Sequence, residues 1–131
     1  MYPDVLSEVY IRFLGALATA QTTYAPLIIS CLLGEFTDVS PSPDSRLRTQ
    51  LHLNAHWALQ HLLNVVPSGH TILVKLLRDT FPHKSAERRE QVSYVYNLLL
   101  IGDYVGHLKG EILSLCVERV VQVDVCRHLR S

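Results

Sequence analysis

The residues of this sequence whose type and spacing suggest metal chemistry are histidines, of which there are seven. His52 and His56 are four residues apart, which places them on one face of a helix, and His61 follows. A zinc-protease helix has a glutamate directly after the first histidine as general base, and this sequence has Leu53 there. Two imidazoles without a third ligand do not fix zinc. The pair is therefore predicted to lie on a solvated helix face, and no metal or other cofactor is expected.

Serine and cysteine nucleophiles have equally little support. Ser30, Cys31 and Cys116 lie inside apolar runs, and no serine stands in a Gly-x-Ser-x-Gly elbow. There is no Walker loop and no dinucleotide fingerprint. Because catalysis requires several roles to be filled together, no enzymatic activity is expected. The odd count of three cysteines predicts free buried thiols in a reducing compartment rather than a disulfide framework.

The composition is that of a globular chain. With 131 residues, 48% of them hydrophobic and 18% charged, the chain is long enough and apolar enough for one compact domain with a core. Lys+Arg and Asp+Glu both number 12, so no direct sequence-specific binding of nucleic acid is expected. The start of the chain has no basic signal region, and apolar stretches such as 25–33 are too short to cross a bilayer. The chain is expected to be intracellular and soluble.

The elements that must position any site are predicted to be helices. The first follows Asp4, which is expected to cap it. Large apolar residues recur in it at a spacing of four: Val5, Val9, Phe13 and Leu17. Its small residues allow another helix to approach closely: Gly15, Ala16 and Ala18.

Five further helices are expected from periodicity and from residues typical of helix ends. They cover about 24–35, 45–66, 68–81, 85–100 and 107–122. Thr23, Ser68 and Ser85 are expected to cap three of them, Pro26 fits the first turn of the second, and prolines 67 and 82 end the third and fourth. The loop 37–45 contains two prolines and three serines, and residues 120–123 are expected to continue the last helix despite local strand propensity.

Six helices with short connections pair naturally as antiparallel hairpins, the first with the second, the third with the fourth and the fifth with the sixth. The third and fifth helices start about 40 residues apart, which is the period of two-helix units of the HEAT type. The predicted fold is therefore all-α, a HEAT-like α-solenoid, with an irregular helical bundle as the alternative.

Two polar features are candidates for recognition or regulation. Ser40 and Ser42 each precede a proline in the 37–45 loop, so they are either proline-directed phosphorylation sites or parts of an ordinary polar linker. A basic cluster spans the connection between the fourth and fifth helices: Lys75, Arg78, His83, Lys84, Arg88 and Arg89. Because Glu87 and Glu90 stand among them, the cluster is either a solvated corner with local ion pairs or a docking patch for an acidic partner surface.

The order of residues over about 10–125 resembles one family. The similar motifs are VP after the third helix, FPHK after the fourth, YVYNLL in the fifth and EIL followed by VERVVQVDV in the sixth. The segment FLGALATAQTTYAPLIISCLLGEF is also similar. Together they resemble the RNA polymerase I-specific transcription initiation factor family.

The resemblance implies a HEAT-repeat solenoid without enzymatic activity, cofactor or metal. It implies a factor that binds RNA polymerase I subunits and promoter-bound core factor, recruits the polymerase to ribosomal DNA, and works in the nucleus and nucleolus. It also implies regulation by phosphorylation, with a serine-bearing docking surface for which Ser85 and Ser93 are the nearest candidates.

Members of that family are several times longer, so the chain is expected to be a fragment of a longer solenoid. Residues 1–125 are expected to form one helical-repeat domain, and 126–131 a divergent tail where the resemblance stops. Two alternatives remain: a generic helical-repeat scaffold for protein interactions, and a truncated product without independent activity.

Overall fold

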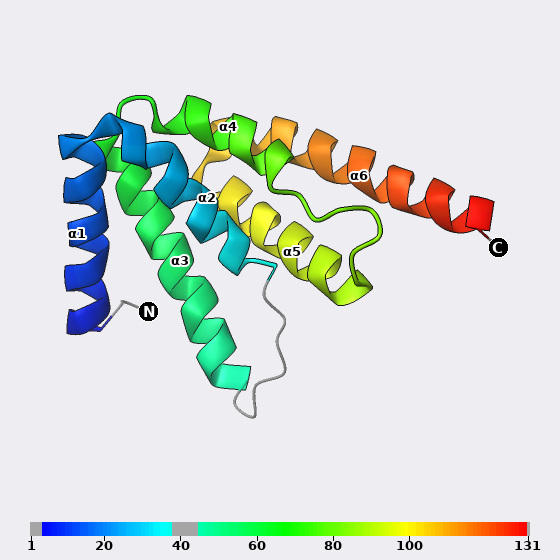
Figure 1. Ribbon diagram of the computed structural model, residues 1–131, viewed down its shortest axis with the longest axis horizontal. Helices are drawn as coiled ribbons and strands as arrows, with labels where there is room; N and C mark the ends of the chain where they lie inside the picture. The colour runs from blue at the N-terminus through cyan, green and yellow to red at the C-terminus, as the bar shows by residue number, and fades with distance from the viewer. Residues whose placement is uncertain (1–3, 38–44, 131) are drawn as a thin grey trace. The chain divides into compact units, whose positions relative to one another are not determined.

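The computed structural model describes residues 4–37 and 45–130, and all regular secondary structure in these ranges is helical (Figure 1). The six α-helices are α1 Val5–Ala20, α2 Ala25–Glu35, α3 Ser45–Val65, α4 Gly69–Asp79, α5 Arg88–Tyr104 and α6 Lys109–Arg130. Short 3-10 helices precede two of them: η1 Thr22–Tyr24 and η2 Gly106–Leu108. The predicted all-α fold of six helices is confirmed.

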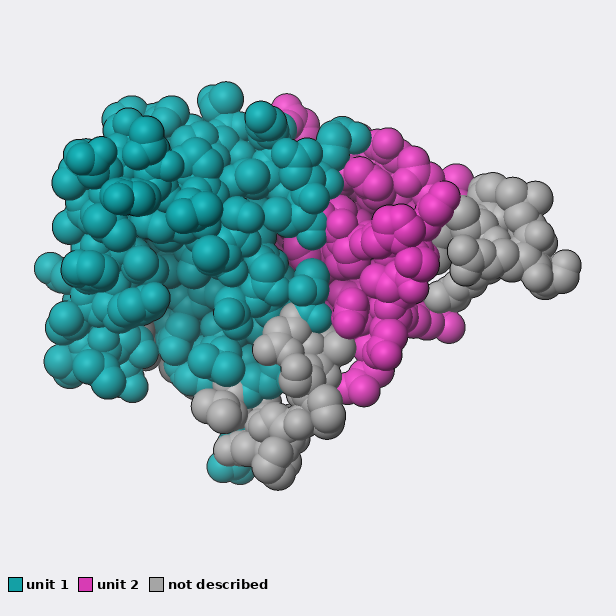
Figure 2. All heavy atoms as spheres, viewed as in Figure 1, with its two compact units in different colours: residues 1–80 teal, residues 81–131 magenta. Residues whose placement is uncertain are grey.

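The chain forms two compact units, which Figure 2 colours separately: Met1–Thr80 with α1 to α4, and Phe81–Ser131 with α5 and α6. In the first unit α1 packs mainly against α3, and α2 packs against both α3 and α4. In the second unit α5 packs against α6. First-with-third and second-with-fourth packing is the stacking of one helical hairpin on the next, as in HEAT-type repeats.

The buried face of α1 is made of small residues. Ile11, Gly15 and Ala18 are buried, whereas Val5, Val9 and Phe13 are 59–79% exposed. A Cβ added to Gly15 would lie 2.5 Å from Nε2 of His61 in α3. The close approach expected at the small residues is therefore present, and the large apolar residues Val5, Val9 and Phe13 lie on the exposed side of α1.

The helix boundaries confirm some of the predicted caps and correct others. Asp4 caps α1 by accepting a hydrogen bond of 2.7 Å from the Ser7 backbone N–H. Hydrogen bonds from the side chain and from the backbone of Ser7 lower the pKa of the Asp4 carboxyl. Thr23 is not a cap, because the chain first makes the η1 turn and Tyr24 takes the N-cap position of α2. Pro26 lies in the first turn of α2 as predicted.

The later boundaries also differ in detail. Ser68 occupies the N-cap position of α4, but its side chain makes no capping hydrogen bond. The prediction that Ser85 caps α5 is wrong: α5 begins at Arg88, after Glu87. The sixth helix passes through 120–123, as predicted, and extends beyond the expected end at 122 as far as Arg130.

Two histidines of α3, His52 and His56, pack against an aromatic ring rather than lie on a solvated face. His56 is 5% exposed and stacks on the buried ring of Phe36, with 4.4 Å between the ring centroids. His52 meets the same ring edge-on at 6.1 Å, and its Nε2 is buried without a hydrogen-bond partner. The predicted solvated face is wrong because Phe36, at the end of α2, packs against this side of α3.

Among the described residues, no single helix has both the length and the apolar composition needed to cross a membrane. By length and composition alone, Val5–Ala20 and Thr22–Glu35 meet the requirement as a pair that is bent by 119°.

Candidate functional site

The connection between α4 and α5 is a structured corner of the second unit. Phe81 is half-buried and meets the fully buried ring of Tyr94 edge-on, with 5.0 Å between centroids. The guanidinium of Arg119, from α6, lies 5.6 Å from the centroid of the Phe81 ring. Aromatic and cation–π contacts of this kind fix Phe81 against both helices of the unit.

Hydrogen bonds hold the backbone that follows Phe81. Nδ1 of His83 lies 2.7 Å from Oγ of Ser85 and 3.1 Å from its backbone nitrogen, which donates to it. The side-chain amide of Gln91, in α5, donates to the backbone carbonyls of His83, Lys84 and Ala86 at 3.2–3.3 Å. The corner therefore presents its side chains from a defined backbone, and the hydroxyl of Ser85 is used in the corner itself.

Three of the predicted docking residues lie on this corner. Lys84, Arg88 and Arg89 are all exposed, and the two arginines stand in the first turn of α5. Positive charge at a helix N-terminus opposes the helix dipole, at a cost of about 0.3–1 kcal/mol for each charge. The side chains of Lys84 and Arg88 have no hydrogen-bond or ion-pair partner among the described residues. The charges of Lys84 and Arg88 are thus available to a partner, and the charge of Arg88 does not stabilise its own helix.

The other two predicted docking residues lie in the first unit. Lys75 and Arg78 are exposed near the end of α4. At that end of the helix a positive charge interacts favourably with the helix dipole, so Arg78 also stabilises α4. A single patch formed by all five cations stays a prediction.

The predicted phosphorylation sites have different environments. Ser40 and Ser42 lie outside the described residues. Ser85 is exposed, and Ser93 is half-buried in α5. Modification at Ser85 would act directly on the corner, because its hydroxyl contacts His83.

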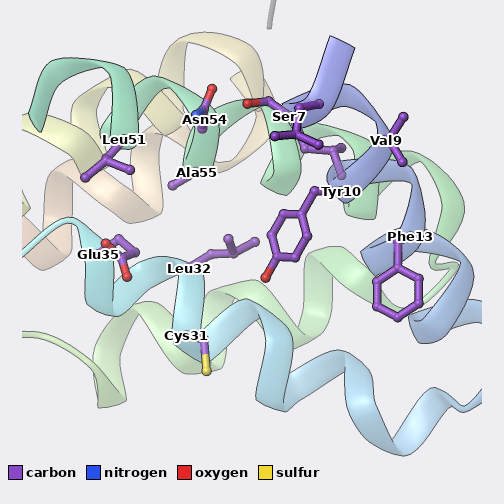
Figure 3. A pocket seen from close by; sticks show the side chains of 12 residues that line it. Ser7, Val9, Tyr10, Phe13, Cys31, Leu32, Glu35, Leu51, Asn54 and Ala55 are labelled. Carbon is purple, nitrogen blue, oxygen red and sulfur yellow. The ribbon is translucent and has the colours of Figure 1, made fainter. Parts of the chain in front are cut away.

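A groove of about 740 Å³, which the sequence did not reveal, lies in the first unit between α1, α2 and α3 (Figure 3). Its walls are mostly apolar, and Figure 3 shows the side chain of Tyr10 extending into it. The lining residues of α1 include Leu6, Val9, Tyr10 and Phe13; those of α2 are Cys31, Leu32 and Glu35; those of α3 are Leu51, Asn54 and Ala55. The apolar spacing of the first helix was a signal for this groove, but spacing alone does not tell which face of the helix is buried.

Metal-binding and thiol chemistry find little support in the side chains. Within the described ranges, no group of three or more His, Cys, Asp or Glu residues is placed to hold a metal ion. Cys116 is buried, and burial raises the pKa of its thiol, so the thiol is protonated at neutral pH. Cys31 is exposed in the groove, which corrects the expectation that it is buried.

Stacked helical hairpins with an exposed basic corner and an open apolar groove define a class of protein, the helical-repeat interaction modules. The family model described as "RNA polymerase I specific transcription initiation factor RRN3" matches residues 1–130. The chain belongs to that family, as its motifs suggested.

Individual relatives agree with the family. The RNA polymerase I-specific transcription initiation factor rrn3 of Schizosaccharomyces pombe is 35% identical over 116 residues, covering 88% of this chain and 18% of that protein. The factor of the same description, RRN3, from Mus musculus is 33% identical over 130 residues, covering 90% of this chain and 20% of that protein. The chain thus spans about a fifth of the length of these curated relatives. No solved structure matches it significantly.

Family membership decides the class of function. The family consists of transcription initiation factors specific to RNA polymerase I, so the prediction that the chain is not an enzyme is confirmed. Neither the corner nor the groove contains a catalytic constellation.

Proposed function

We propose that this chain is a polymerase-binding segment of an RNA polymerase I initiation factor. It contacts RNA polymerase I subunits, cooperates with promoter-bound core factor, and so contributes to recruitment of the polymerase to ribosomal DNA in the nucleus and nucleolus. The observation that carries this proposal is the family match, which extends over 1–130 and thus over both compact units.

The basic corner supplies the docking chemistry in this proposal. Lys84 and Arg88 carry exposed charges without a described partner, and Arg88 stands where its charge opposes the dipole of α5. Residues that cost their own helix stability are good candidates for binding, since binding explains their presence better than folding does. In this proposal the partner surface is acidic, Arg89 adds a third charge at the corner, and Lys75 and Arg78 are further candidate docking residues in the first unit.

Co-purification tests the proposal. The tagged 131-residue chain, incubated with purified RNA polymerase I, is expected to retain the polymerase on beads. The variant with Lys84, Arg88 and Arg89 all changed to Glu is expected to bind about tenfold more weakly or less, and wild-type binding is expected to weaken as salt rises. Unchanged binding by this variant would remove the corner from the proposal.

A matched control separates the corner from net charge. Arg12, Arg46 and Lys109 are also exposed cations and lie outside the corner, so reversing all three gives the same change in net charge. This control variant is expected to keep most of the binding. A chain that retains no polymerase at all, while it remains folded by circular dichroism, would favour the alternative of a generic scaffold.

Phosphorylation is proposed as the regulation of this docking. A phosphate at Ser85 adds nearly two negative charges beside Lys84 and removes the hydroxyl that contacts His83. Ser85→Asp is expected to weaken polymerase binding, and Ser85→Ala to leave the basic field intact. Mass spectrometry of the protein from growing cells tests whether Ser85, Ser40 and Ser42 are modified.

A further inference from the structure

One side chain, that of Gln91, fastens the connection before α5 to the helix itself. Its amide nitrogen donates to the backbone carbonyls of His83 and Lys84 at 3.3 Å each and to that of Ala86 at 3.2 Å. An amide has only two N–H groups for these three carbonyls, so the donors are shared among them. The three carbonyls lie five to eight residues before Gln91, and the contacts therefore join a loop to a helix.

The backbone that this amide holds is a tight turn. The N–H of Ala86 donates to the carbonyl of His83 at 2.8 Å, which closes a β-turn with Lys84 and Ser85 at its central positions. This segment is called the 83–86 turn below. None of the described non-glycine residues has a positive φ, so the turn needs no strained backbone. The glutamine amide thus fastens a turn that its own backbone hydrogen bond has already closed.

The fastened turn brings two cations to one side of α5. Arg88 and Gln91 are three residues apart and so lie on one face of the helix, and the carbonyl of Lys84 is bonded to that face. Neither Lys84 nor Arg88 has a hydrogen-bonded or ion-paired side chain, and the nearby Glu87 and Glu90 form no ion pair with them among the described residues. Like charges repel, so folding alone does not favour this arrangement.

We propose that Gln91 is a positioning residue for docking. By fastening the 83–86 turn to α5 it fixes the direction in which Lys84 is presented beside Arg88, and so raises the affinity of the corner for an acidic partner surface. This inference rests on the proposed docking function of the corner. Its physical reason is preorganisation: a mobile loop loses backbone freedom when it binds, whereas a fastened loop has lost that freedom on folding.

Stability of the chain explains the contact less well. The backbone N–H of Gln91 already donates to the carbonyl of Glu87 at 3.2 Å, so α5 does not need the side chain for its own ladder. Two of the three carbonyls belong to the exposed residues His83 and Lys84, where water is an equivalent partner. Because an exposed hydrogen bond adds little net stability, the side chain decides where the turn lies more than whether the chain folds.

Substitutions at Gln91 separate hydrogen-bond donation from shape. Gln91→Met keeps the length of the side chain and donates nothing, whereas Gln91→Lys offers three N–H donors to the same three carbonyls. Exchange of the Ala86 amide hydrogen, measured by NMR on the 131-residue chain, reports on the turn. It is expected to be about fivefold faster in Gln91→Met, as loss of one net hydrogen bond predicts, and close to the wild-type rate in Gln91→Lys.

Two comparisons show whether the effect is local. Exchange of the Leu98 amide, in the buried body of α5, is expected to stay unchanged in Gln91→Met. Gln122→Met, at an exposed glutamine of α6 in the same unit, is expected to leave both amides unchanged. Equal acceleration at Ala86 and Leu98 would mean a general loss of stability, and unchanged exchange at Ala86 would mean that the turn is not held by Gln91. Either result would overturn the proposal.

Binding to purified RNA polymerase I tests whether the effect reaches the docking surface. Gln91→Met is expected to weaken binding about fivefold, and to have little effect in a Lys84→Ala background, because it acts through Lys84. The same loss in both backgrounds would refute the positioning role. A wild-type chain that retains no polymerase would remove the proposed function and this role together, whereas wild-type binding that Gln91→Met leaves unchanged would remove the positioning role alone.

Discussion

The contact between Gly15 and His61 is where α1 approaches α3 most closely, and it gives the sharpest test of the packing. A methyl group at Gly15 would lie 2.5 Å from Nε2 and 2.6 Å from Cδ2 of His61. Overpacking of this kind costs about 1–3 kcal/mol, while replacing glycine by alanine inside a helix gains about 1 kcal/mol. Because the His61 side chain is half-buried and can move, we take about 2 kcal/mol for the overpacking and expect a net loss of about 1 kcal/mol.

A second glycine serves as the control. Gly34 in α2 has nothing within 4 Å of the position that a Cβ would take. Gly34→Ala is therefore expected to stabilise the chain by about 0.5 kcal/mol, through the smaller entropy of its unfolded state; the gain is smaller than inside a helix because Gly34 lies in the last turn of α2. Urea unfolding followed by the fluorescence of Trp57, the single tryptophan, which lies in α3, reports on this unit directly. The two variants should differ by about 1.5 kcal/mol, with Gly15→Ala the less stable.

A double variant tests the cause. His61→Ala removes the ring that the new methyl group meets, so Gly15→Ala should cost at least about 1 kcal/mol less in that background than alone. Strictly additive effects, or a Gly15→Ala chain as stable as Gly34→Ala, would refute the close packing of α1 on α3 as described.

Three further predictions concern other elements. Asp4→Ala should reduce helicity, measured by circular dichroism, because α1 loses its cap and frays. Because the pKa of Asp4 is lowered in the folded chain, the contribution of Asp4 to stability is present above about pH 4 and is lost as pH falls further. Asp4→Asn should cap α1 without this pH dependence. Phe81→Leu should cost about 1–2 kcal/mol by losing the edge contact with Tyr94 and the cation–π contact with Arg119, which hydrogen exchange of α5 would show as faster exchange. Burial raises the pKa of Tyr104, so its contribution to stability is complete below about pH 10 and is lost progressively as pH rises further. Tyr104→Phe should therefore flatten the fall in unfolding midpoint above about pH 10.

The helices were predictable from the sequence because their signals are local. Apolar spacing, Asp4 as a cap and Pro26 in a first turn all act within a few residues, and all were confirmed. The failures at Thr23 and Ser85 have different causes. The chain makes a 3-10 turn at Thr23 before α2 begins, and the hydroxyl of Ser85 contacts the ring of His83 instead of capping α5.

Which face of a helix is buried was less predictable, because that depends on the neighbouring helix. Val5, Val9 and Phe13 share a face that periodicity alone identifies as apolar, and the small residue Gly15 lies on a different one. Both faces suit burial, and the packing of α3 against the small side decides between them. The burial of His56 likewise depends on a neighbouring element, because only the position of Phe36 shows that His56 is buried.

The same ambiguity has a functional consequence. A helix with one apolar face buries that face and presents polar residues to solvent. Helix α1 has two such faces, uses the small one against α3, and leaves the large one more than half exposed. Leu6 and Phe13 bury little surface within this unit, as expected for a face on which a neighbouring helical repeat packs. At the corner the unfavourable feature is a charge, because Arg88 opposes the dipole of its own helix. Both features are unfavourable for the isolated chain, and at the corner the proposed docking of an acidic partner surface accounts for the cost.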